Sequence, residues 1–172
     1  MPPDAVILLD IGSTGYTVNY IWVNVPNQGC TPGWWKNRGL GAYDDPSDSL
    51  AVAVTQAVAN QWYGGSAPTG FDGTHNALFS VAFNLADPGQ MQGAPSGLTL
   101  LGAVELNGGG FNALARQGTA ALLNSLSVAY EYTPQQVLQK VHDAFVTGNL
   151  GTLVDDFDTA NNRDHSFCPI GE

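Results

Sequence analysis

The stretch FNALARQGTAALLNSL, residues 111–126, predicts an amphipathic helix in the second half of the chain. Most of its apolar residues recur at intervals of three or four positions, which places them on one helical face. Residues 120–123 favour helix at every position, and the three glycines 108–110 mark a break before the helix. The apolar face consists of Phe111, Leu114, Ala115, Ala121, Leu122 and Leu126.

Helical patterns also precede this stretch. Asp45-Pro46 begins a segment in which an apolar residue returns every four positions, from Leu50 to Trp62, until two glycines end the pattern. Residues 75–85 predict a shorter helix. Residues 97–106 fit either a helix or a strand, because a short apolar run does not distinguish the two.

Two further helices are predicted toward the C-terminus. Residues 133–136, Thr-Pro-Gln-Gln, combine an N-cap threonine, a proline in the first turn and a capping-box glutamine. Gly148 is a typical stop for the helix that follows. Residues 150–157 then carry apolar side chains at helical spacing, which predicts one more amphipathic helix.

The N-terminal residues 5–25 have the composition of β-strands instead. The run 16–25, YTVNYIWVNV, is rich in β-branched and aromatic residues, and residues 12–15 permit a hairpin turn or a bend. Strands followed by helices indicate an α+β fold, with a β-strand segment at residues 1–28 and a helix-rich, bundle-like domain at 29–172. The expected assembly strand contains Tyr16, Val18, Tyr20, Ile21, Trp22 and Val23.

The charge balance excludes several partner classes. Five Lys and Arg residues against fifteen Asp and Glu residues give the 172-residue chain a formal net charge of −10. Such a surface repels phosphate, so we expect no nucleic acid and no anionic membrane as a partner. The longest apolar run, residues 5–9, is too short for membrane insertion, and with Asp4 before it forms no secretory signal. We therefore expect a processed start or export by another route.

The two cysteines lie near opposite ends of the sequence. Cys30 and Cys168 form no CxxC pair and have no histidine cluster beside them, so zinc binding is not indicated. A long-range disulfide is the favoured interpretation, and it points to an oxidising, extracellular location. The alternative is two buried free thiols in a cytosolic protein.

Several short motifs resemble a known domain. The chain is similar to the uncharacterised secreted domain with a CTPG-aromatic-WKN motif, which occurs in exported bacterial and archaeal surface proteins. The resemblance covers residues 29–171. The motifs are GCTPGWWKN at 29–37, Ala115-Arg116-Gln117, AALLN at 120–124, Tyr132-Thr133, Ala160-Asn161-Asn162 and Cys168-Pro169-Ile170.

The resemblance implies an extracellular setting and the pairing of Cys30 with Cys168, but no reaction. This sequence departs from the family pattern in two places. The stretch after the motif lysine is short, at residues 38–43, and Asp164-His165 stands near the second cysteine.

Candidate binding residues fall into an aromatic group and an acidic group. Trp34, Trp35 and Tyr43 are interpreted either as a clamp of the core or as a platform for sugar rings. A weak calcium site is predicted from a carboxylate cluster, although its spacing is not that of an EF-hand and an acidic helix start or a solvated acidic face is the favoured interpretation. The cluster consists of Asp155, Asp156 and Asp158.

Catalysis finds little support in the sequence. No serine lies in a G-x-S-x-G motif, and His75, His142 and His165 fall on different predicted elements. We therefore expect no enzyme activity and no cofactor.

Two functions remain. The first is an extracellular structural protein, a subunit of a surface filament or layer that assembles by giving its N-terminal strand to another copy of itself. The alternative is a monomeric secreted module that binds carbohydrate through exposed Trp and Tyr residues. This second class would use the aromatic group above or Trp62 and Tyr63.

Overall fold

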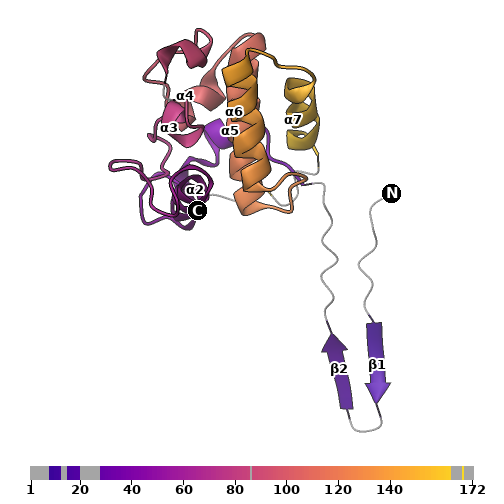
Figure 1. Ribbon diagram of the computed structural model, residues 1–172. Coiled ribbons are helices and arrows are strands. Elements are labelled where there is room, and N and C mark those ends of the chain that lie inside the picture. The colour runs from indigo at the N-terminus through magenta and orange to yellow at the C-terminus, as the bar shows by residue number, and fades with distance from the viewer. Residues whose placement is uncertain (1–7, 13–14, 20–27, 86, 164–167, 169–172) are drawn as a thin grey trace.

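Helices build the protein from residue 32 onward (Figure 1). The computed structural model describes residues 8–12, 15–19, 28–85, 87–163 and 168. The α-helices are α1 Pro32–Asn37, α2 Ser49–Trp62, α3 Phe79–Ala82, α4 Leu100–Glu105, α5 Gly110–Ser127, α6 Pro134–Thr147 and α7 Leu153–Asn161. Two short 3₁₀ helices, η1 Leu40–Ala42 and η2 Pro88–Met91, lie between them.

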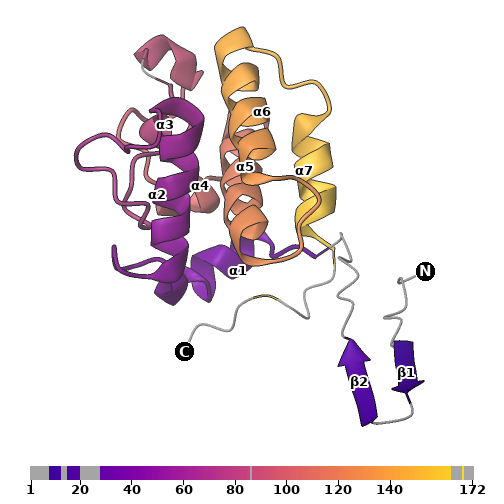
Figure 2. The same cartoon turned by 60° about the horizontal axis from the view of Figure 1, so that its bottom comes forward.

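Helix α5 lies at the centre of the domain. It packs against α1, α2, α4, α6 and α7, and Figure 2 shows α2 and α7 on either side of the α5–α6 pair. From Ala113 to Asn124 every residue except Arg116 is buried. The predicted helix is therefore present, but it is enclosed on nearly all sides where the sequence predicted a single apolar face.

A glycine allows the close approach of α5 and α6. A Cβ atom on Gly118 would lie 2.7 Å from a methyl group of Val141 on α6. Only a residue without a side chain fits at this contact, so Gly118 fixes the distance between the two helices.

Local signals explain where several helices begin and end. Thr133 caps α6, and its reciprocal bond with Gln136 completes the predicted capping box. Gly148 ends α6 in the left-handed conformation, with φ at 70°. The ambiguous residues 97–106 form α4, which Thr99 caps, whereas only Phe79–Ala82 of the expected helix 75–85 is helical.

The predicted α+β fold class is wrong, because the described part of the domain is helical and no strand layer takes part in it. Within the described residues, strands β1 Leu8–Gly12 and β2 Gly15–Asn19 pair only with each other, in an antiparallel hairpin that Figure 1 shows apart from the helices. The β-branched composition favours an extended backbone locally, but a sheet needs further strands, and the later segments form helices.

The same hairpin removes the reason for expecting an assembly strand, which was the lack of a partner strand in this chain. Tyr16 is paired with Ile11 and Val18 with Leu9 of the same chain, so these positions already have a partner strand. The other four residues of that strand, Tyr20, Ile21, Trp22 and Val23, lie outside the described residues. The assignment of residues 1–28 and 29–172 to separate segments stays a prediction.

The predicted disulfide between Cys30 and Cys168 is confirmed. The two Cα atoms are 5.7 Å apart, and the bond joins positions separated by 138 residues. It ties the segment before α1 to the segment after α7. Within the described part of the chain, none of the helices has the length and apolar character needed to span a membrane.

Candidate binding cleft

The side chain of Asn124 holds the segment that carries the first cysteine. Its Oδ1 accepts hydrogen bonds from the Cys30 backbone N–H at 3.0 Å and from the Trp35 indole Nε1–H at 2.9 Å. Its Nδ2 donates to the Cys30 carbonyl at 2.9 Å. Asn124 has no exposed surface, so these bonds replace water for both the asparagine and the cysteine backbone.

Two more buried amides extend this contact to α7. Asn161 Oδ1 accepts bonds of 2.8 Å from Asn124 Nδ2 and from the Tyr130 hydroxyl. Asn161 Nδ2 donates to the backbone carbonyl and to Oε1 of Gln117, and Gln117 Nε2 donates to Asp158 Oδ1. We call Gln117, Asn124 and Asn161 the amide network. Each of its side-chain oxygens and nitrogens has a partner, which makes it a stabilising arrangement.

The helical repeat explains how the amide network forms. Gln117 and Asn124 are seven positions apart on α5, so they lie on one face two turns apart. Asn161 reaches them from the last turn of α7. Burial raises the pKa of Tyr130, with smaller contributions from Tyr132 and Glu131, so its hydroxyl remains a donor to Asn161 at neutral pH.

The motif aromatics belong mainly to the core. Trp35 and Tyr43 have no exposed surface, and Trp35 makes edge-to-face contacts with Trp34 and Tyr43 at centroid distances of 4.8 and 6.1 Å. The indole N–H of Trp35 is used by Asn124. Trp34 alone of the three is partly exposed. Trp35 and Tyr43 therefore act as a clamp and present no platform to a sugar ring.

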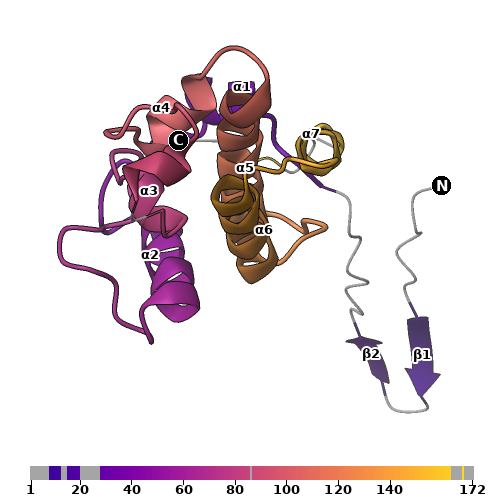
Figure 3. The ribbon, with the colours of Figure 1, turned by 45° about the horizontal axis from the view of Figure 1, so that its top comes forward.

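A polar cleft lies beside the amide network. Its volume is about 420 Å³, and its walls come from the start of α1, the end of α4 with the following loop, the middle of α5 and the end of α7. Figure 3 shows the ends of α1 and α4 near α5, with α7 beside them. The polar residues of the cleft are Thr31, Lys36, Glu105, Asn107, Arg116, Gln117, Asp158 and Asn162.

Arg116 is held in place inside this cleft. Its Nη1 donates to the backbone carbonyls of Leu106, at 2.6 Å, and Gly108, at 3.3 Å. Neither Arg116 nor Lys36 has a carboxylate within 4 Å among the described residues. In that part of the chain the single ion pair joins Arg163 and Glu131. Two cations therefore line one cleft without a counter-charge in contact.

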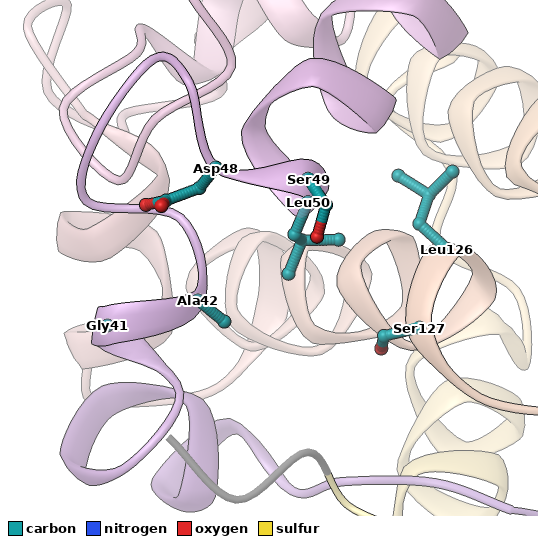
Figure 4. Close-up of a pocket in the computed structure, with 7 residues that line it drawn as sticks. All are labelled: Gly41, Ala42, Asp48, Ser49, Leu50, Leu126 and Ser127. Atoms are coloured by element: carbon teal, nitrogen blue, oxygen red, sulfur yellow. The ribbon is translucent and has the colours of Figure 1, made fainter. Parts of the chain in front are cut away.

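A second hollow of about 450 Å³ lies where η1, the start of α2 and the end of α5 meet (Figure 4). Its one charged residue is Asp48, which accepts a bond from the backbone N–H of Asp45. The Ser127 hydroxyl donates to the Leu123 carbonyl. Because both groups serve local structure, this hollow offers less recognition chemistry than the polar cleft.

The predicted calcium ligands do not come together. Asp158 accepts bonds from Gln117 and Asn162, while Asp156 accepts one from the Thr152 hydroxyl. Asp155 lies with Asp156 in the first turn of α7. Across the described ranges, no three His, Cys, Asp or Glu residues are arranged to hold a metal ion.

The histidines are spread over the molecule. His142 Nδ1 is 3.0 Å from the Phe83 carbonyl, and its ring contacts that of Trp62 in a tilted arrangement with centroids 5.0 Å apart. His75 makes an edge-to-face contact with Tyr43, and its backbone N–H donates to the Tyr43 carbonyl. His165 lies outside the described residues. Both described histidines are thus engaged in packing.

Sequence reasoning quoted Arg116 and the residues of the amide network but gave them no role, and it assigned Asp158 of the cleft only to a calcium site. Arg116, Gln117, Asn124 and Asn161 all fall in the motifs at 115–117, 120–124 and 160–162. The available signal was a set of polar residues within apolar helical segments, which usually marks buried hydrogen bonding.

The fold and the site define a small helical domain that is clamped by one disulfide and has a motif-lined polar cleft. Residues 69–163 match the family model of the Protodermal factor 1 C-terminal domain, and this is more than half of the chain. The chain therefore belongs to the Protodermal factor 1 C-terminal domain family. No curated protein and no solved structure matches it.

This family membership corrects the resemblance to a bacterial and archaeal surface domain, because the matching family is a plant family. The match starts after α2, so Cys30 and Trp35 lie outside it, whereas Asn124, which binds both, lies inside it with Gln117 and Asn161. The motif at 29–37 therefore lies before the family match and contacts the motif at 120–124, which lies inside it.

The two predicted functions are overturned together. The filament subunit with strand donation is wrong, because the family is a different one and the described strands pair within the chain. The carbohydrate-binding alternative is wrong as well, since two of its three motif aromatics are fully buried. In both cases groups assigned to partners are used within the chain: the backbone of the described strands forms the hairpin, and the side chains of Trp35 and Tyr43 lie in the core.

Proposed function

We propose that this chain is an extracellular, oxidatively folded recognition module that binds a partner through the polar cleft and catalyses no reaction. The observation that carries the proposal is the link between disulfide and cleft. Asn124 bonds both backbone groups of Cys30, and the same amide network reaches Gln117 and Asp158 in the cleft wall.

This link makes the cleft depend on an oxidising environment. The disulfide holds Cys30 beside α5, which keeps the start of α1, including Thr31 and Lys36, at the edge of the cleft. A preorganised cleft loses less entropy on binding than a mobile one. Disulfides that join distant segments persist in extracellular compartments and are rare in the cytosol.

A non-catalytic role is supported by the chemistry of the cleft walls. Its ionisable groups are two carboxylates and two cations, with no histidine, cysteine or serine among its polar residues. Arg116 and Asp158 are each held by hydrogen bonds to the domain itself. Such fixed charges suit recognition of a charged ligand.

The proposal is tested on the native protein. Free thiols are blocked with an alkylating reagent before unfolding, and peptide mass mapping then determines whether Cys30 and Cys168 are joined. We expect the disulfide in essentially all molecules. Hydrogen exchange should also show faster exchange of Gln117 and Asn161 backbone amides after reduction, with α6 less affected. Two results would contradict the proposal: alkylated cysteines in the native protein, or exchange rates of the Gln117 and Asn161 amides that do not change on reduction.

A further inference from the structure

We propose that the polar cleft binds an acidic side chain within a peptide segment of a partner protein, with Arg116 and Lys36 receiving its carboxylate. This inference rests on the proposed recognition function and names the chemistry of its ligand.

Arg116 is prepared for a carboxylate. A guanidinium has five N–H donors in a fixed plane. The Nη1 group is used by the Leu106 and Gly108 carbonyls, and no hydrogen bond of Nε or Nη2 is present within the described structure. The Nε–Nη2 edge matches the two oxygens of a carboxylate, and the anchored Nη1 reduces the freedom that binding would remove.

Lys36 adds a second positive charge at the other wall of the cleft. It lies on α1, is exposed, and has no ion pair among the residues that the structure describes. The chain has only five Lys and Arg residues and a net charge of −10. Two of these five cations line one cleft, where they balance the charges of Glu105 and Asp158, so the cleft lining is neutral on a chain with a strongly negative net charge.

The acidic residues of the cleft favour a peptide over a simple anion. Asp158 is oriented by Gln117 and Asn162 through its Oδ1, and Glu105 lies on the wall formed by α4. These carboxylates accept hydrogen bonds and repel a second negative charge. A peptide supplies backbone N–H donors beside its acidic side chain, whereas phosphate brings a higher charge and few donors.

The size of the cleft agrees with a short segment of chain. Its volume of about 420 Å³ lies in the range of roughly 300–1,000 Å³ that is common for ligand pockets. Most of the residues that line the cleft are polar or charged, which points to side-chain and backbone hydrogen bonds as the main contacts.

The binding test uses the oxidised full chain labelled with ¹⁵N. The probes are the blocked peptide acetyl-Gly-Glu-Gly-amide, its neutral counterpart acetyl-Gly-Gln-Gly-amide, and inorganic phosphate. We expect the Glu peptide to shift the Arg116 Nε resonance and backbone amides of residues 105–108, and to bind at least about tenfold more tightly than the Gln peptide. Equal binding of both peptides, tighter binding of phosphate, or shifts elsewhere would overturn the proposal.

Matched variants separate this site from general charge effects. Lys36→Gln should weaken binding of the Glu peptide several-fold, whereas Arg38→Gln, an equal charge change on an exposed neighbour outside the cleft, should leave it unchanged. Arg116→Lys keeps the charge but loses the paired donors, and should weaken binding about tenfold or more. If Arg116→Lys fails to fold, the comparison of Lys36→Gln with Arg38→Gln still tests whether the Glu peptide binds in the cleft. Equal effects of these two variants would overturn the proposal even if the native disulfide is intact.

Discussion

The N-terminal hairpin and the Cys30 segment lie close in sequence but differ in what holds them. The hairpin, residues 8–12 and 15–19, rests on pairing between its own two strands. The Cys30 segment is held by Asn124, 94 positions away, and by Cys168, 138 positions away. The hairpin, which has the strand-like composition, is therefore the segment with the weaker connection to the helical domain.

The comparison teaches that local propensity and structural importance are separate properties. β-branched residues set the backbone conformation of the hairpin, but a two-stranded hairpin is marginally stable in water. The buried amides that hold the Cys30 segment, by contrast, have no effect on local propensity that the sequence reveals. Their effect comes from satisfying backbone groups that would otherwise be buried without partners.

The largest expected effect comes from removing the disulfide. The double substitution Cys30→Ala and Cys168→Ala frees a loop that spans 138 positions. We expect the free energy of unfolding to fall by roughly 3–5 kcal/mol, because the unfolded chain gains the corresponding freedom. Denaturant unfolding of the variant and the oxidised protein gives the value. A loss below about 1 kcal/mol would show that the Cys30 segment is held without the bond.

Asn124→Ala should have the next largest effect. It removes the Asn124 bonds of the Cys30 backbone groups and of the Trp35 indole, and it takes away one of the two donors to Asn161 Oδ1. We expect a loss of about 3–4 kcal/mol in unfolding free energy. The matched control is Asn112→Ala on the same helix, which removes one exposed bond to Asn107 and should have an effect of about 1 kcal/mol or less. Similar losses for both variants would refute the special role of the amide network.

Alkaline pH should weaken the domain moderately. Burial raises the pKa of Tyr130 and of Tyr43 above the ordinary value of 10.0, with Glu105 adding to the shift at Tyr43. A raised pKa in the folded state means that the stabilisation is complete below about pH 10 and is lost as the pH rises toward the folded-state pKa. We expect a loss of up to about 1.4 kcal/mol per buried tyrosine for each pH unit above 10.

The measurement is the free energy of unfolding between pH 8 and pH 11. Tyr130→Phe should show a shallower fall above pH 10 than the unmodified chain, because one of the two hydroxyls with strongly raised pKa values is gone. An identical fall in the variant would mean that Tyr130 does not contribute to the loss of unfolding free energy at alkaline pH.

The smallest expected effect comes from removing residues 1–27. The described strands in this segment pair with each other, while the Gln28 backbone N–H still donates to the Ala129 carbonyl. We expect the free energy of unfolding of the helical domain to change by less than about 0.5 kcal/mol. Circular dichroism during thermal unfolding measures it, and a loss above about 1 kcal/mol would place the N-terminal segment among the elements that stabilise the domain.

Much of the helical part could be predicted because its signals are local. The Thr133 cap and the Gly148 stop are set by neighbouring backbone groups, so they can be recognised in the sequence alone. Residues 75–85 had helical periodicity but form only the short α3. Their backbone instead pairs with the segment before α4, at Leu78 and Thr99, and this partner is invisible to a local pattern.

The site could be predicted only in part. The pairing of the two cysteines followed from their number and from the exclusion of metal motifs. The roles of Gln117, Asn124 and Asn161 depend on how α5 and α7 pack, which the spacing of polar residues does not specify. The orientation of Trp35 toward Asn124 likewise required the structure, because a tryptophan in a turn motif serves equally as a core or a surface residue.

The amide network, through Asn124, holds the Cys30 segment and the Trp35 side chain against α5. Hydrogen exchange of the Trp35 indole Nε1–H tests this claim most directly. Two-dimensional NMR of the oxidised protein can follow this proton beside that of the partly exposed Trp34. We predict that the Trp35 indole exchanges as slowly as the buried backbone amides of α5, and that Asn124→Ala abolishes this protection. A Trp35 indole that exchanges as fast as Trp34 in the unmodified protein would contradict the claim.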